Sequence, residues 1–156
     1  MARALGIAGL LVSAVGLFLG FYVLSAHPAT AFRIVAGSCV GIVGLLAFLR
    51  HTVFHRDDAA RLGWATERPD WQYEVGFANL AFALMAGLAV CLAGDARVAG
   101  VVLAGYAAYL VQAAFLHLHR YLTDAERSPA RLWRSVVATL VYAGMMGFFA
   151  LAALKA

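Results

Sequence analysis

The chain has 156 residues, of which 64% are hydrophobic and only 13% are charged, and its formal net charge is +4. A soluble domain is usually about half apolar and a quarter charged, so this composition excludes an ordinary soluble domain and favours a membrane protein. The basic residues form no lysine-rich run and no continuous stripe, so nucleic acid is not an expected partner.

The apolar residues are concentrated in blocks without charge. These blocks are residues 4–26, 34–49, 75–94, 98–116 and 135–154. A bilayer core of about 30 Å needs about 20 residues of helix. Four blocks meet that length almost alone. The second meets it if the helix also includes Phe32, Arg33, Arg50 and His51, with the polar ends extending toward the headgroups.

We therefore predict one domain, residues 1–156, that is an all-α integral membrane protein with a bundle of five transmembrane helices. A four-helix bundle is the alternative. The spans are expected at residues 4–26, 32–55, 71–94, 98–122 and 131–155.

The first predicted span, residues 4–26, carries a face of small residues. Gly16 and Gly20 have the spacing that lets another helix backbone approach closely in a membrane. We favour packing within the chain over a homodimer contact for this face. Arg3 before the span and Ala29-Thr30-Ala31 after it also resemble a signal peptide, but the apolar run is longer than a signal core, so an uncleaved helix is expected.

The second helix is expected to begin near Phe32, after a short loop at His27-Pro28, because proline cannot donate a hydrogen bond inside a helix. It should continue beyond the membrane to Leu62 and end at Gly63, a typical C-terminal cap. A second face of small residues follows this helix and predicts close packing: Gly37, Gly41 and Gly44.

Cap and turn residues delimit the remaining spans. Asp70 is expected to cap the third helix, residues 94–97 to form the turn to the fourth, and Ser128-Pro129 to start the fifth. Cys39 and Cys91 lie inside predicted spans. Their simplest interpretation is as small apolar core residues, with a disulfide between adjacent helices as the alternative.

The basic residues are distributed unequally between the two sides of this arrangement. Nine fall on one side: Arg3, Arg50, Arg56, Arg61, Arg68, Arg120, Arg127, Arg131 and Arg134. Arg33, Arg97 and Lys155 fall on the other. Because positively charged loops stay in the cytoplasm, we predict a multi-pass protein of the cytoplasmic (inner) membrane with its N-terminus inside and its C-terminus outside.

Histidines at the ends of apolar spans are the strongest functional signal. His51 and His55 are four residues apart, and a continuous helix would place Asp58 on the same face. Such a pair can chelate a metal ion, and a carboxylate can complete or orient the ligand set. The candidate metal ligands are His51, His55, Asp58, Glu74 and His119. A transition metal, namely Zn, Fe, Cu or Mn, suits them, and haem is less favoured.

Further polar groups are expected within the membrane. His117 and His119 diverge because two helical positions are about 200° apart. His119 shares its face with Gln112, and we expect both to face the bundle interior. His117 and Asn79 complete this set of polar residues.

Three functions are compatible with these residues. They are a metal-binding protein with chemistry at its cytoplasmic face, an oligomeric channel or transporter for ions or small solutes, and an accessory subunit of a larger membrane complex. The expected partners are accordingly the lipid bilayer and either further copies or other membrane subunits. Interfacial histidines, and Glu74 in a first helical turn, also have an ordinary structural interpretation. Whether the protein is an enzyme stays open, because the sequence carries no Walker, Gly-x-Ser-x-Gly or dinucleotide motif.

Three short motifs lie between Arg50 and Gly87. They are Arg50-His51-Thr52, Leu62-Gly63-Trp64 and the run Gln72-Tyr73-Glu74-Val75-Gly76-Phe77-Ala78-Asn79-Leu80, of which Glu-Val-Gly-Phe-Ala-Asn-Leu is the most specific part. This region resembles an uncharacterised family of small bacterial multi-span membrane proteins. The resemblance implies a membrane fold and singles out Glu74 and Asn79, but it implies no activity.

Overall fold

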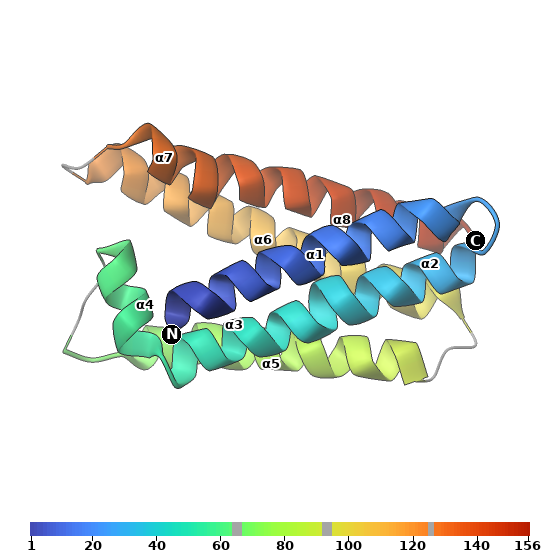
Figure 1. Cartoon of the computed structure of the whole chain (residues 1–156), viewed down its shortest axis with the longest axis horizontal. Helices are drawn as coiled ribbons and strands as arrows, with labels where there is room; N and C mark the ends of the chain where they lie inside the picture. Colours follow the sequence, from blue (N-terminus) through green and yellow to red (C-terminus); the bar gives the residue numbers. More distant parts are fainter. Residues whose placement is uncertain (64–66, 92–94, 125–126) are drawn as a thin grey trace.

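The computed structural model describes residues 1–63, 67–91, 95–124 and 127–156, and this part of the chain is helical with no strand. The long helices run side by side along one axis (Figure 1). Five stretches in the described residues are long and apolar enough to cross a membrane: Ala2–Leu24, Pro28–Thr52, Asp70–Cys91, Ala96–Thr123 and Pro129–Lys155. The predicted all-α bundle with five spans is confirmed, and the four-helix alternative is wrong.

Three spans are single helices, namely α1 (Ala2–Leu24), α5 (Asp70–Cys91) and α6 (Ala96–Thr123). The second span consists of α2 (Pro28–Val35), the π-helix η1 (Ala36–Ile42) and α3 (Val43–Thr52). The fifth span consists of α7 (Pro129–Leu132), the π-helix η2 (Trp133–Val137) and α8 (Ala138–Lys155). A short helix, α4 (His55–Leu62), lies outside the spans.

The helix ends follow the expected cap chemistry with two exceptions. The Ser128 side chain accepts a hydrogen bond from the Arg131 N–H, and Gly63 ends α4 in the left-handed conformation with φ of 70°. Pro28 does not close a loop; it is the first residue of α2, where a missing N–H costs nothing. Asp70 is likewise the first residue of α5 rather than its cap. Of the predicted turn at 94–97, residue 94 lies outside the described residues, and Asp95 caps α6 by accepting from the Arg97 N–H.

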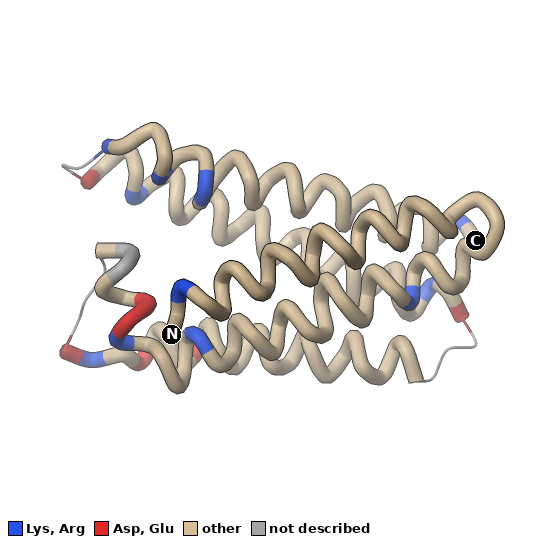
Figure 2. Tube along the Cα trace, in the orientation of Figure 1, with Lys and Arg blue, Asp and Glu red and all other residues tan. Residues whose placement is uncertain are grey.

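The charged residues lie at the two ends of the bundle and leave the length between them without Lys, Arg, Asp or Glu (Figure 2). One end holds the N-terminus, α4 and α7, and we call it the α4 end (Figure 1). The opposite end holds the start of α2 and the C-terminus. The basic residues that the sequence assigns to one side belong to the elements of the α4 end.

Small residues set the closest approaches between helices. A Cβ atom at Gly16 would overlap Ser38 Oγ, and one at Gly44 would lie 2.8 Å from the Asn79 carbonyl oxygen. Gly20 meets Val35 and Phe149, Gly37 meets Val90, and Gly41 meets Ala86. The five glycines predicted for helix packing therefore all pack within the chain, as favoured for Gly16 and Gly20.

A buried polar group joins α1, η1 and α8 in the middle of the bundle. The Val43 N–H donates to Ser38 O and Val40 O, and so passes over Cys39 O, its partner in a regular α-helix. The Tyr142 hydroxyl donates to Cys39 O over 2.8 Å and lies 3.1 Å from the Ser13 hydroxyl. The π-helix thus offers a carbonyl that α8 uses for a tertiary bond.

Both cysteines are free, so the disulfide alternative is not formed. Cys39 is buried and packs against the Ser13 backbone, as predicted for a core residue. Cys91 is exposed at the last residue of α5, so its predicted place in the core is wrong. The two residues lie in different environments, since Cys39 lies where η1 packs against α1 and Cys91 lies at the exposed end of α5.

We predict that Gly16→Ala lowers the free energy of unfolding by about 1 to 3 kcal/mol, the usual cost of overpacking. The added Cβ would also lie 2.7 Å from Ser38 Cβ, which no rotation of the Ser38 side chain relieves. The control is Gly9→Ala in the same helix, where a Cβ meets nothing within 4 Å. Equilibrium unfolding in detergent measures both, and equal stabilities of the two variants would contradict this packing.

Candidate functional site

The helix predicted to run unbroken to Leu62 is interrupted between α3 and α4. Phe54 has φ of −108° and ψ of 27°, and its N–H donates to Leu49 O rather than to the carbonyl one turn back. The His55 side chain contacts Thr52 O through Nδ1 at 2.8 Å. Because a side chain takes a backbone carbonyl at this point, the regular ladder of helical hydrogen bonds ends here. His51, His55 and Asp58 consequently do not form one continuous helix face.

The break folds Asp58 back onto the end of α3. Its side chain is fully buried, with Oδ2 3.1 Å from His51 Nδ1 and Oδ1 3.4 Å from Arg50 Nε. His51 itself is 8% exposed. We call Arg50, His51 and Asp58 the charge cluster; it lies at the α4 end, close to α1, since Arg50 Nη1 is 3.8 Å from a Cβ built at Gly6.

The partners of His51 define its protonation. Arg50 Nη2 lies 3.1 Å from His51 Nε2, and a guanidinium can only donate, so Nε2 accepts. The Nδ1 atom then carries the proton and faces the Asp58 carboxylate. The contact between Nδ1 and Asp58 Oδ2 is an ion-pair contact and not a hydrogen bond. A metal ion at Nε2 would have to displace Arg50.

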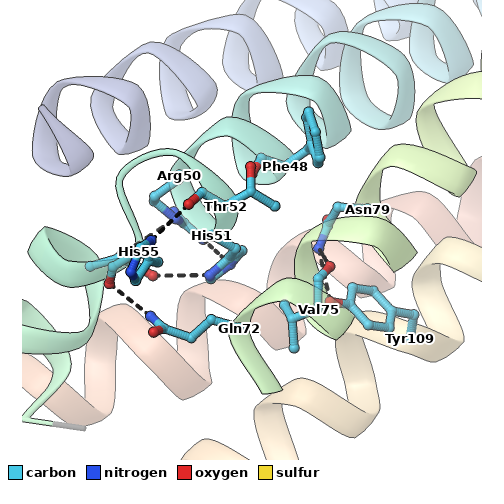
Figure 3. Close-up of polar contacts among 10 residues, drawn as sticks. Phe48, Arg50, His51, Thr52, His55, Gln72, Val75, Asn79 and Tyr109 are labelled. Carbon is cyan, nitrogen blue, oxygen red and sulfur yellow. Dashed lines mark hydrogen bonds and ion pairs between the residues drawn. The ribbon is translucent and has the colours of Figure 1, made fainter. Parts of the chain in front are cut away.

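His55 lies at the break between α3 and α4 and contacts α5 there. Its backbone carbonyl accepts a 2.8 Å hydrogen bond from Gln72 Nε2, and its ring lies edge-on to Tyr73 with 5.4 Å between centroids. Figure 3 shows the Gln72 amide pointing at the His55 carbonyl and not at the His51 ring. Gln72 is 1% exposed, so this bond is made in the interior.

The recognised run from Gln72 to Leu80 is the face of α5 that packs against α3. Gln72, Gly76 and Asn79 are buried, at a spacing that places them on one side of a helix. A Cβ at Gly76 would lie 2.6 Å from Thr52 Cγ2. Glu74, the carboxylate of the same run, is exposed.

Asn79 continues the polar contacts into the membrane region. Its Nδ2 donates to Val75 O at 2.8 Å and to the Tyr109 hydroxyl at 2.9 Å (Figure 3). The Tyr106 hydroxyl donates to Asn79 Oδ1 at 3.5 Å. Asn79 is buried and thereby joins α5 to α6.

The predicted ligand His119 and the predicted in-membrane residues Gln112 and His117 do not join the charge cluster. His119 and Gln112 are exposed, and His117 is half-buried. The expectation that His119 and Gln112 face inward is therefore wrong, because the inner side of α6 is filled by residues that pack in the core: Ala99, Gly100, Leu103, Tyr106 and Ala107. In the part of the chain that the structure describes, no three His, Cys, Asp or Glu side chains come together as possible metal ligands.

Four residues of this region were not among the predicted site residues. Arg50 belongs to the charge cluster, and Gln72 donates to the His55 carbonyl. Tyr106 and Tyr109 form hydrogen bonds with Asn79. The spacing of Tyr106 and Tyr109, three residues apart on a helix, was an available signal for a shared face.

A second ion pair at the α4 end connects α6 to α7. Asp124 accepts a 2.6 Å hydrogen bond from Arg131 Nη2, and Arg120 Nε lies 4.0 Å from its other carboxylate oxygen. The Arg131 hydrogen bond holds the pKa of Asp124 below its ordinary value. This carboxylate is paired with arginines, so it does not supply a metal ligand.

The helices and their packing define a small multi-pass membrane protein with five spans. A family model described as a family of unknown function, DUF6790, matches residues 3–156, so the chain belongs to that family. No curated protein and no solved structure matches the chain. The predicted resemblance to an uncharacterised family is confirmed at this level, while the motif at 74–80 and a bacterial source stay predictions.

We predict that Asp58→Asn lowers the free energy of unfolding by roughly 3 kcal/mol, because loss of one member of a buried ion pair leaves its partners uncompensated. Protection of α4 from hydrogen exchange should fall as well. The control is Asp57→Asn, since the neighbouring Asp57 side chain is 59% exposed and pairs with the N-terminus. A change of less than about 0.5 kcal/mol is expected there, and equal losses in both variants would rule out this role of the cluster.

Proposed function

We propose that this protein is a membrane subunit without chemistry of its own, which acts by binding another membrane-spanning helix. Its contact surface is the outward face of α6, which comprises Val101, Gly105, Ala108, Gln112, Phe115 and His119. All six residues are exposed and recur at helical spacing. The observation that carries the proposal is the amide of Gln112 on this face.

Gln112 lies deep in the span. The helix α6 has 28 residues, and Gln112 is about three residues from its midpoint, or roughly 4 Å along the axis. The hydrocarbon core extends about 15 Å to either side of its centre, so the amide cannot reach water. His119 is two turns further along and reaches the boundary, where water and headgroups satisfy its ring.

An amide in hydrocarbon without a partner is unfavourable by several kcal/mol in simple transfer terms. Among the described residues Gln112 makes no hydrogen bond. Polar side chains of this kind bond across helices in membranes, and small residues beside them let the backbones approach. Ala108 and Gly105 provide that space one and two turns away. A second helix on this face accounts for all three residues.

Photo-crosslinking in native membranes tests this function. A photoreactive residue at position 108 should form protein adducts at ordinary expression levels, because another helix covers it. The matched position is 81, an exposed alanine near the middle of α5, where adducts should be confined to lipid. Positions 105 and 112 should behave like 108. Absence of protein adducts at 108, or equal adducts at 81, would contradict the proposal.

The orientation in the membrane follows from the charge distribution. We propose that the α4 end faces the cytoplasm of an inner membrane, because it holds most of the basic residues. Cys91, exposed at the opposite end, should then react from outside with a maleimide that does not cross membranes. Buried Cys39 is the internal control, and labelling of Cys91 from the cytoplasmic side alone would invert the orientation.

The transition-metal function has one supporting observation, the 3.1 Å approach of His51 to Asp58. It is the second candidate because Arg50 occupies the Nε2 side of that ring and would repel a cation. Metal analysis of protein purified without a histidine tag decides this point.

A channel would require several copies around a pore lined by Gln112 and His119, and so it depends on the same α6 face.

A further inference from the structure

We propose that the helix covering the outward face of α6 is α6 of a second copy of this chain. This inference rests on the assembly function proposed above. The two helices cross about a two-fold axis along the membrane normal, and the two Gln112 amides hydrogen-bond to each other. The polar site is therefore incomplete in one chain and is completed by the same residue of the other.

Membrane symmetry favours this occupant. Copies of one chain share one orientation in a bilayer, so a two-fold axis along the normal brings each residue to the depth of its counterpart. A residue on the crossing line then meets itself. A charged residue there would repel its copy, whereas an amide carries both donor N–H groups and an acceptor oxygen. Gln112 is thus complementary to itself, and a different partner chain would need a matching polar group at the same depth.

The neighbouring residues fit a close crossing. Ala108 is exposed and shares the face of Gln112, so it leaves room for the backbone of the second copy. Gly105 is exposed on the same face, beside α5 of its own chain, where a Cβ would lie 3.4 Å from Phe82 Cε1. The faces of Gly16 and Gly44 are occupied, since Gly16 meets Ser38 and Gly44 meets Asn79. A Cβ at Gly87, Gly144 or Gly147 would meet nothing within 4 Å, but the face of α6 differs from these positions because it adds an exposed amide to its small residues.

Disulfide trapping provides the first test. Cysteine is placed at position 108 in a Cys91→Ser background, which leaves buried Cys39 as the other thiol. Oxidation of native membranes should join two copies through position 108, because identical residues at a crossing come within the roughly 7 Å between Cα atoms that a disulfide needs. Ala81→Cys in the same background, the same substitution on exposed α5, should remain a monomer.

The strength of association provides the second test, measured by energy transfer between labelled copies in lipid. Gln112→Leu should weaken the dimer between about three- and thirty-fold, the range for one interhelical hydrogen bond. Ala108→Leu should weaken it by blocking close approach, and Ala81→Leu should leave it unchanged. Because all three side chains are exposed, circular dichroism and thermal unfolding should show an unchanged fold.

The possible results separate this inference from the proposed function. A covalent dimer through position 108, weakened association in Gln112→Leu and none of these effects at 81 support the second copy. Protein adducts at 108 of another mass, without disulfide trapping between copies, overturn the second copy but leave the assembly function in place. Absence of any protein adduct at 108 overturns both.

Discussion

In a bilayer, a buried polar group has no water to bond, so each one must find its partner inside the protein. The structure of this chain follows from that constraint. Tyr142 bonds the Cys39 carbonyl and thereby holds α8 to η1. Asn79 bonds Tyr109 and holds α5 to α6. The charge cluster does the same at the membrane boundary, where Asp58 fastens α4 to the end of α3. Between them, these three groups fix elements from every span.

Such bonds form only where helices approach closely, and lipid supplies no hydrophobic driving force to bring them together. Glycine provides the approach: Gly44 faces the Asn79 backbone, and Gly76 faces Thr52 beside the charge cluster. The recognised run from Gln72 to Leu80 gains a physical explanation here. Its glycine permits the contact with α3, and its two amides, on the same face, bond to α4 and to α6 from one helix.

Uncharged length and cap residues were sufficient to predict five spans and the packing glycines, because both depend on local sequence. The charge cluster depended on an event that periodicity does not report, the break at Phe54, which moved His55 away from His51 and brought Asp58 to it. The same limit explains Gln112 and His119. Spacing predicted that these two residues share a face of α6, but it did not predict whether that face points into or out of the bundle. The face of α6 that points into the bundle is occupied by small residues and by Tyr106.

Gln112 is subject to the same need for a hydrogen-bond partner, but its side chain lies on the outside of the bundle. The bundle satisfies Ser13, Gln72 and Asn79 internally, and it does so with residues from several helices. It places one amide on its outside, near the middle of a span, on a face of small residues. On the proposed function, a protein helix beside α6 supplies the hydrogen-bond partner of this amide. The charge cluster, in which Arg50 and His51 pair with Asp58, holds α4 to the end of α3, and the proposed function is assigned to the outward face of α6.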